Sequence, residues 1–300
     1  MPDLSTRLGK LKLANPLVLC AGISGLNVNL WLKHAKEAGV VTIKSCSLTP
    51  RVGHANPTVV EIDKNIVLNA IGLSNPGAQE TAREIVEYKS KCKTTPLIAS
   101  LFGKKIEEFG ETAAILDRAK PDIIEIDASC PNVEGVMFSN DTVLIAKVTE
   151  AVRENTSLPV FVKLSAAGND IVPIANAAVA AGADGITAIN TLPGMAIDPI
   201  ARKPILTNKF GGVSGRAIKP MAVRSVYLIR KALPEVPIIG MGGVTYGTDV
   251  AEMIIAGANA VGVGTAVMYR KNAFTTLKNE LREFMDENGY KNIGALKLDD

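Results

Sequence analysis

The chain has 300 residues, of which 47% are hydrophobic and only 4% aromatic, and its formal net charge is +3. A chain of this length can bury a large core, and the absence of a dense Lys/Arg run argues against nucleic acid as a partner. No stretch approaches the ~18 apolar residues of a membrane span, and the N-terminus lacks the apolar core of a signal peptide. We therefore expect a cytoplasmic protein that is not bound to membranes.

The cysteines and histidines are few. The four cysteines show no C-x-x-C spacing and are too few for a disulfide scaffold, which fits a reducing compartment. The two histidines, His34 and His54, make His-based catalysis or a zinc site unexpected, so no metal is predicted. The cysteines are Cys20, Cys46, Cys92 and Cys130.

Short apolar runs alternate with helical patterns along the whole chain. The predicted strands are Leu17–Cys20, Val41–Lys44, Leu97–Leu101, Ile123–Ile126, Val160–Lys163, Gly185–Ile189, Ile238–Gly240 and Ala260–Val263. The predicted helices are Val28–Ala38, Ala78–Lys91, Ile106–Ala119, Thr142–Glu154, Ile171–Ala181, Pro220–Leu233, Asp249–Ala256 and Phe274–Asn288. Eight strands, each followed by a helix, predict an α/β fold of the (β/α)8 TIM-barrel type.

Two insertions interrupt this alternation. Residues Thr49–Leu68 follow the second strand, and residues Thr191–Lys219 follow the sixth. Both leave from the C-terminal ends of strands, where barrel enzymes build active sites and lids. Because no linker-like composition separates them from the rest, we predict one domain over residues 1–300.

Nearly every predicted strand ends in a small, polar or cationic residue, although the strand interiors are apolar. In a barrel these ends meet at one rim, so a functional rim is predicted there. Strands of any α/β protein can also stop where polarity begins, but lysines, a cysteine and asparagines exceed that pattern. The rim residues include Lys44, Ser45, Ser100, Asp127, Cys130, Asn132, Lys163, Asn190 and Thr191.

Two glycine-containing turns follow the last two strands. Gly240-Met-Gly-Gly-Val and Val263-Gly-Thr-Ala each lead into a helix, and their exposed backbone amides would suit an anion such as phosphate. Glycine also serves in ordinary turns, so either run alone is a weak indication. Neither run is a G-x-G-x-x-G dinucleotide fingerprint.

Three rim residues have two readings each. Lys163 and Lys44 close apolar strands, so each is either a surface lysine with a buried stem or a cation that points inward. An inward cation would suit a ligand that becomes anionic, such as a reduced flavin. Cys130 is either a packed small hydrophobe or a reactive thiol. Its position beside Pro131 and Asn132, outside a strand, favours reactivity.

Seven motifs in this order resemble the class 1 dihydroorotate dehydrogenases over almost the full chain, and are most similar to the catalytic subunit of the NAD-linked class 1B. They are Leu-Asn-Ala-Ile-Gly-Leu-Ser-Asn-Pro-Gly (68–77), Ser-Cys-Pro-Asn (129–132), Val-Lys-Leu-Ser (162–165), Ile-Asn-Thr-Leu (189–192), Gly-Gly-Val-Ser-Gly-Arg-Ala-Ile-Lys-Pro (211–220), Ile-Ile-Gly-Met-Gly-Gly-Val (238–244) and Val-Gly-Thr-Ala (263–266).

The resemblance implies FMN across the barrel mouth and oxidation of (S)-dihydroorotate to orotate in pyrimidine biosynthesis. Cys130 matches the base that removes the proton from C5 while hydride passes to flavin N5. The implied flavin-binding residues are Ala21, Lys44, Ser45, Ser100, Asp127, Lys163, Ile189, Gly215, Gly242, Gly243, Gly264 and Thr265. The implied substrate-binding residues are Lys44, Asn69, Ala70, Ile71, Gly72, Leu73, Asp127, Asn132, Asn190 and Thr191.

The chain departs from the family pattern at three places. Asp127 and Ser100 stand where the family commonly has Asn, and Ala166-Ala-Gly stands where Pro-Asn is common. A carboxylate at position 127 cannot donate a hydrogen bond unless it is protonated. It would also repel the carboxylate of orotate at close range.

The implied partners follow from the same resemblance. A homodimer is expected, and a heterotetramer with an FAD and iron–sulfur subunit would pass the electrons to NAD. The alternative enzyme is a related FMN-dependent pyrimidine reductase of the dihydropyrimidine dehydrogenase type, whose uracil-type substrate lacks a carboxylate. A phosphate-binding barrel isomerase, or a binding protein without redox chemistry, is the third reading.

Overall fold

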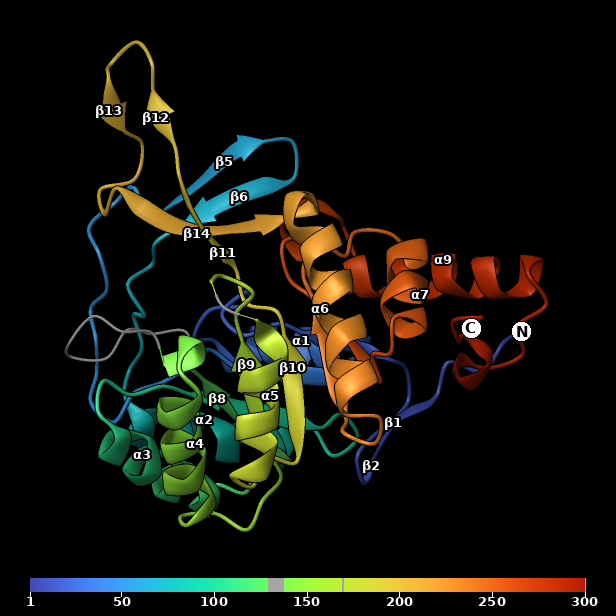
Figure 1. The fold of residues 1–300 in the computed structure, drawn as a ribbon, viewed down its shortest axis with the longest axis horizontal. Coiled ribbons are helices and arrows are strands. Elements are labelled where there is room, and N and C mark those ends of the chain that lie inside the picture. Colours follow the sequence, from blue (N-terminus) through green and yellow to red (C-terminus); the bar gives the residue numbers. More distant parts are fainter. Residues whose placement is uncertain (129–137, 169, 300) are drawn as a thin grey trace.

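The computed structural model describes residues 1–128, 138–168 and 170–299. Eight parallel strands form a closed barrel, in which each strand pairs with the next barrel strand along the chain. The predicted barrel is therefore confirmed (Figure 1). The barrel strands are β3 (Leu17–Leu19), β4 (Val40–Thr42), β7 (Leu97–Leu101), β8 (Ile123–Asp127), β9 (Val160–Leu164), β10 (Gly185–Ala188), β15 (Ile238–Met241) and β16 (Ala260–Val263).

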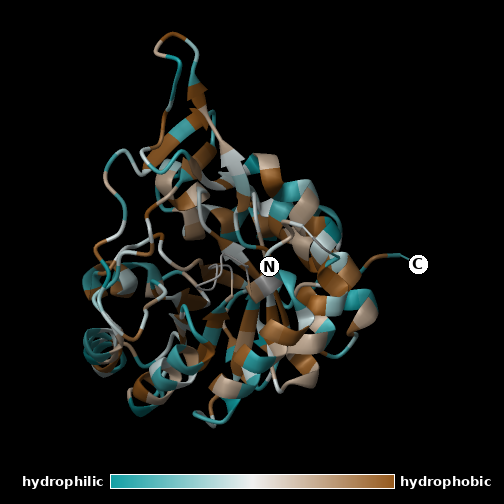
Figure 2. Ribbon diagram, turned by 60° about the vertical axis from the view of Figure 1, so that its left-hand side comes forward, coloured by the Kyte–Doolittle hydropathy of each residue, from teal (hydrophilic) through white to brown (hydrophobic). Residues whose placement is uncertain are grey.

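Helices cover the outside of the barrel, because each has one apolar stripe. In α2, for example, Ala78, Thr81, Ile85 and Tyr88 recur at helical spacing and are buried. Figure 2 shows hydrophobic residues along the strands, whereas the helices alternate hydrophobic and hydrophilic residues. The helices are α1 (Val28–Ala35), α2 (Ala78–Lys91), α3 (Ile106–Arg118), α4 (Thr142–Arg153), α5 (Ile171–Ala180), α6 (Lys219–Ala232), α7 (Gly247–Ile255), α8 (Ala266–Tyr269) and α9 (Ala273–Glu287).

The N-terminal end of the barrel is closed by a hairpin. Its strands β1 (Thr6–Leu8) and β2 (Leu11–Leu13) pair antiparallel, and both Leu8 and Leu13 are buried. They join an apolar cluster formed by the first inward-facing residues of the barrel strands. This cluster contains Val18, Val40, Ile98, Ile123, Phe161, Ile239 and Ala260. The half of the barrel at the N-terminal ends of its strands, called the lower half below, is therefore a packed core.

The two insertions form a small sheet, which was not predicted. Its strands pair antiparallel in the order β11, β14, β6, β5, so the second insertion binds the first. Figure 1 shows this sheet beyond the barrel, with the β12–β13 hairpin projecting furthest. The strands are β5 (Val59–Asp63), β6 (Ile66–Asn69), β11 (Leu192–Met195), β12 (Ile197–Asp198), β13 (Lys203–Pro204) and β14 (Phe210–Gly215).

Three short 3-10 helices complete the described chain: η1 (Phe138–Asn140), η2 (Arg216–Ile218) and η3 (Ile293–Ala295). Among the helices of the described residues, none combines the length and the apolar character needed to cross a membrane.

Candidate active site

The inward faces of neighbouring strands bring polar side chains together in the upper half of the barrel, at the C-terminal ends of the strands. Glu125 and Asp127 are two residues apart in β8 and therefore point to the same side of the sheet. In the barrel register Asp127 lies opposite Lys163 of β9, and Lys163 lies opposite Thr187 of β10. Ser100 of β7 lies opposite Glu125. All five side chains are buried.

Asp127 and Lys163 form a buried ion pair. The Lys163 Nζ donates to Asp127 Oδ2 at 3.1 Å, and the two side chains are 9% and 7% exposed. Burial by itself disfavours the ammonium, but the carboxylates of Asp127 and Glu125 outweigh it and raise the pKa of Lys163. Lys163 is therefore a charged residue that points inward, and the surface reading of this lysine is wrong.

Further polar groups hold the Asp127 carboxylate in place. The Asn190 Nδ2 donates to Oδ1 at 3.2 Å, and the Ser45 hydroxyl donates to Oδ2 at 3.4 Å. The Ser45 and Ser100 hydroxyls are 2.9 Å apart. Five of the predicted rim residues therefore make one connected cluster, with three of them in strands β7, β8 and β9 and two in the segments that follow β4 and β10.

Glu125 and Thr187 belong to the same cluster, although the sequence reasoning missed both. The Thr187 hydroxyl donates to Glu125 Oε2 at 3.0 Å, whereas Oε1 has no hydrogen-bond partner among the described residues. Burial raises the pKa of Glu125 above its usual range. The available signal was a glutamate inside the otherwise apolar run Ile123–Ile126, two residues before Asp127.

The glycine turns after the adjacent strands β15 and β16 bring together backbone amides at partly buried residues. Gly242 and Gly243 have φ of +127° and +75°, and a Cβ on Gly243 would lie 2.6 Å from the Cβ of Lys219. In the described chain, the amides of residues 242, 243, 264 and 265 donate no hydrogen bond to a backbone carbonyl. Such amides fit the phosphate of a bound cofactor.

Neighbouring segments complete this part of the rim. The Thr265 hydroxyl donates to the Ser214 hydroxyl at 2.9 Å, which brings the end of β14 and Gly215 to the turn at Gly264. Gly215 has φ of +92°, and a Cβ there would overlap with the carbonyl of Asn65. The Ile189 side chain is buried, and a Cβ on Gly242 would meet it at 3.5 Å. The predicted phosphate residues therefore lie together.

The predicted substrate segment, residues 69–73, lies where the two insertions meet. The Asn69 Nδ2 donates to the Gly212 carbonyl at 3.1 Å, so it fastens β6 to β14. Thr191 also lies against Gly212, where any side chain would overlap with its hydroxyl. Gly72 has φ of +76° and packs against His54, whose amide donates to the Ile71 carbonyl at 3.1 Å. Ala70 and Leu73 complete this segment, with Leu73 at φ +59°.

Two predicted rim residues that follow the first two barrel strands lie close together. Ala21 follows β3, and the Lys44 side chain passes Gly22, where a Cβ would lie 3.2 Å from Lys44 Cδ. Strand β4 ends at Thr42, so Lys44 lies just beyond the strand that was predicted to include it.

Cys130 and Asn132 lie outside the described residues, so their predicted roles stay predictions. Cys46 is buried and Cys20 is partly buried, and desolvation raises the pKa of each thiol to about 12. Both are therefore protonated at neutral pH. Cys92 caps the C-terminus of α2 on the outside of the barrel.

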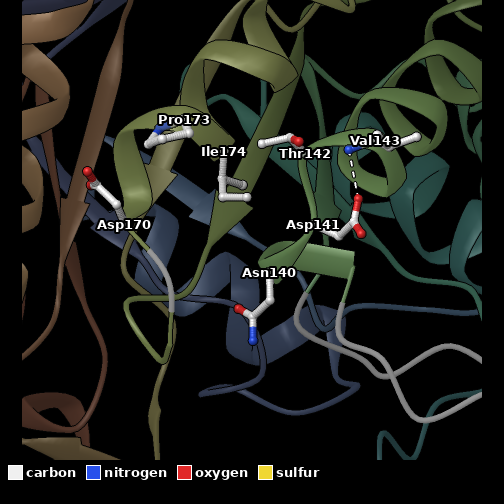
Figure 3. A pocket seen from close by; sticks show the side chains of 7 residues that line it. All are labelled: Asn140, Asp141, Thr142, Val143, Asp170, Pro173 and Ile174. Atoms are coloured by element: carbon white, nitrogen blue, oxygen red, sulfur yellow. Dashed lines mark hydrogen bonds between the residues drawn. The ribbon is translucent and has the colours of Figure 1, made fainter.

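A separate cavity of about 360 Å³ lies between the N-termini of α4 and α5 (Figure 3). Its two carboxylates are engaged in helix capping, since Asp141 accepts from the amides of Val143 and Leu144 and Asp170 accepts from that of Val172. The cavity contains none of the predicted rim residues.

Comparison with known proteins agrees with this arrangement. Residues 3–285 match the family model described as "Dihydroorotate dehydrogenase". The chain is 43% identical to a Methanosarcina mazei protein over 94% of this chain and 90% of the relative. It is 41% identical to a Geotalea daltonii protein over 99% of both chains. Both are named "Dihydroorotate dehydrogenase B (NAD(+)), catalytic subunit".

A solved structure shows the same fold. The crystal structure of DHODH from Eimeria tenella in complex with ferulenol is similar with a TM-score of 0.85 and 22% identity, and the match covers 99% of this chain and 89% of that one. The sequence matches, which extend over almost the whole chain, determine the family. The chain belongs to the dihydroorotate dehydrogenase family.

Proposed function

We propose that this chain is the catalytic subunit of a dihydroorotate dehydrogenase, which oxidises (S)-dihydroorotate to orotate in pyrimidine biosynthesis with FMN as cofactor. The whole of residues 1–300 would act as one barrel domain in the cytoplasm. The observation that carries the proposal is the arrangement of the rim. Buried Lys163, the glycine turns after β15 and β16, and Asn190 lie at the C-terminal end of one barrel, and Asn69 lies in the small sheet built by the insertions at that end.

The rim fits a flavin mononucleotide at two points. The amides at residues 242, 243, 264 and 265 would hold the phosphate, with Gly215 and the Thr265 hydroxyl beside them. Lys163 and its neighbours Ser45, Ser100 and Asp127 would face the ring, with Ala21, Lys44 and Ile189 as further contacts. When bound, FMN supplies the hydride acceptor, and the protein supplies orientation and charge.

Asparagine side chains would recognise the substrate. The amides of Asn69, Asn132 and Asn190 offer donors and acceptors that match a pyrimidine ring, and Lys44 would meet the substrate carboxylate. The backbone of residues 70–73, together with Thr191 and Asp127, would complete the binding site.

Cys130 is the proposed base for the C5 proton. Loss of hydride from C6 requires loss of this proton, and a thiolate on the opposite face of the substrate can accept it. The pKa values of Cys20 and Cys46, about 12, make both poor candidates. An unperturbed thiol has a pKa of about 8.5, so only a few per cent is thiolate at neutral pH.

The names of the relatives support a partner subunit. A "catalytic subunit" acts with another chain, and we propose a homodimer of this chain in a heterotetramer with an FAD and iron–sulfur subunit that reduces NAD. The isolated chain should then reduce an artificial electron acceptor with dihydroorotate but should not reduce NAD.

The test is a comparison of two substrates with the purified protein. The protein should be yellow and release FMN on denaturation, and it should oxidise dihydroorotate much faster than dihydrouracil, because only the former has a carboxylate for Lys44. A preference for dihydrouracil would support the pyrimidine reductase alternative. A protein without flavin would overturn the proposal.

A further inference from the structure

We infer that Asp127 is a positioning residue that acts through Lys163: it neutralises the cation facing the flavin and so lowers the reduction potential of the bound cofactor. This inference rests on the proposed function, since it requires a flavin at this rim. The charge of Asp127 is decisive, because an Asn at position 127 would offer no counter-charge to Lys163.

The geometry fixes the carboxylate on the lysine. Lys163 Nζ and Asp127 Oδ2 are 3.1 Å apart, and the two residues are register partners on adjacent strands. Asn190 holds the other oxygen of Asp127 at 3.2 Å, and Ser45 approaches the shared one at 3.4 Å. The carboxylate of Asp127 is held from three sides and stays on Lys163, because the two residues lie on adjacent strands of a closed barrel.

Glu125, the second carboxyl of the cluster, does not pair directly with Lys163 in the described chain. Glu125 lies deeper in the barrel, and its hydrogen bond comes from Thr187. Within the described residues it makes no ion pair with Lys163, and its Oε1 has no hydrogen-bond partner. Asp127 is therefore the direct counter-charge of Lys163, and Glu125 is a more remote one.

The ion pair between Asp127 and Lys163 changes the net charge that a flavin at this rim would meet. Reduction places negative charge on the N1–C2=O edge of the ring, so a lone buried cation there favours the reduced form. A carboxylate bound to the cation offsets this effect, because charges interact strongly in a buried site. A lowered potential suits delivery of electrons to a low-potential acceptor, such as the nicotinamide named for the relatives.

The first test uses Asp127→Asn with FMN bound, and it measures sulfite affinity and the two-electron reduction potential. Sulfite adds through sulfur to flavin N5, and the displaced electron pair moves to the N1–C2=O edge, so the adduct reports the charge near that edge. We expect sulfite to bind at least tenfold more tightly in the variant. The equivalent rise in potential is about 30 mV for a two-electron couple.

A charge-matched pair of variants controls for loss of folding. Lys163→Met should weaken sulfite binding at least tenfold, because it leaves the Asp127 carboxylate alone. The double variant Asp127→Asn/Lys163→Met removes both charges and should return to within threefold of the native affinity. Glu125→Gln should shift the affinity less than Asp127→Asn does.

Three results would overturn the inference: an unchanged affinity in Asp127→Asn, a double variant as weak as Lys163→Met alone, or an equal shift in Glu125→Gln. A native protein without flavin would instead contradict the proposed function itself. If flavin is bound but its reduction potential is the same in all these variants, only the role of Asp127 is contradicted.

Discussion

The two ends of the barrel are built on the same eight strands but have opposite interiors. Towards the N-terminal end, Val18, Ile98 and Phe161 pack in an apolar cluster that the β1–β2 hairpin covers. Towards the C-terminal end, the same strands carry Glu125, Lys163 and their polar neighbours, which are just as buried.

The difference separates the part of the barrel that stabilises the fold from the part that carries the chemistry. Burial of apolar side chains stabilises the lower end, with no polar group that needs a partner. Burial of charges at the upper end opposes folding unless each charge is paired, and one oxygen of Glu125 lacks a partner within the described chain. We therefore expect substitutions at the lower end to change stability, and substitutions at the upper end to change chemistry or, where a buried carboxyl is removed, stability as well.

The largest expected effect belongs to the upper end. Cys130→Ala should slow dihydroorotate oxidation at neutral pH by about 100-fold to 10,000-fold, because a general base contributes about that much. The flavin content should stay unchanged, since the cofactor is held by other residues. Steady-state turnover and flavin absorbance would measure the two quantities. Cys92→Ala, on the outer helix layer, is the matched control and should retain native turnover.

The same thiol should give the rate a pH dependence. Oxidation should become faster as the pH rises towards the pKa of Cys130, because the thiolate is the base. A flat profile between about pH 6 and 9 would contradict proton abstraction by this residue.

At the lower end, Phe161→Ala should destabilise the protein by about 3–5 kcal/mol, because it leaves a cavity in the apolar cluster. Denaturant unfolding would measure this loss. Phe161→Leu, which keeps most of the volume, should cost clearly less. Equal losses for the two variants would mean that the lower end is not closely packed.

Glu125→Gln should raise stability at neutral pH, since it removes a buried carboxyl whose ionisation is disfavoured by burial. The folded-state pKa of Glu125 is raised, so the native protein should lose stability as the pH rises above the unfolded-state pKa. The variant should lack this loss. Unfolding free energies measured across pH would show it, and Glu150→Gln, at an exposed position, should change stability by less than about 0.5 kcal/mol.

The smallest effect is expected at the phosphate turns. Thr265→Val should weaken FMN binding about tenfold, because the hydroxyl would donate to the phosphate in place of Ser214, and one hydrogen bond to a charged group contributes about 1.5 kcal/mol. Fluorescence titration of the flavin-free protein with FMN would measure the affinity. An unchanged affinity would remove Thr265 from the phosphate site.

The barrel itself was predictable from the sequence, because apolar runs of four or five residues end in glycine or polar residues. Leu97–Leu101 and Ala260–Val263 were predicted with the bounds that the structure shows. Other ends shifted, as at α1, which ends at Ala35 rather than at Ala38. Such ends depend on local capping, which the apolar pattern does not record.

The small sheet could not be predicted, since it depends on contacts between distant segments. Asn69 and Gly212 are 143 residues apart, and β14 is rich in glycine. The pairing of Asp127 with Lys163 was missed for a similar reason, because barrel closure sets that register. Glu125 was missed because a single charge in an apolar run carries no information about its partners.

The central claim is that the polar end of this barrel holds a flavin that accepts hydride from dihydroorotate. The most direct test is to add dihydroorotate without oxygen to the purified protein and to follow the visible absorbance of the bound flavin. We predict that the absorbance is lost and that one equivalent of orotate forms per flavin. A flavin that stays oxidised, or a protein that carries none, would contradict the account.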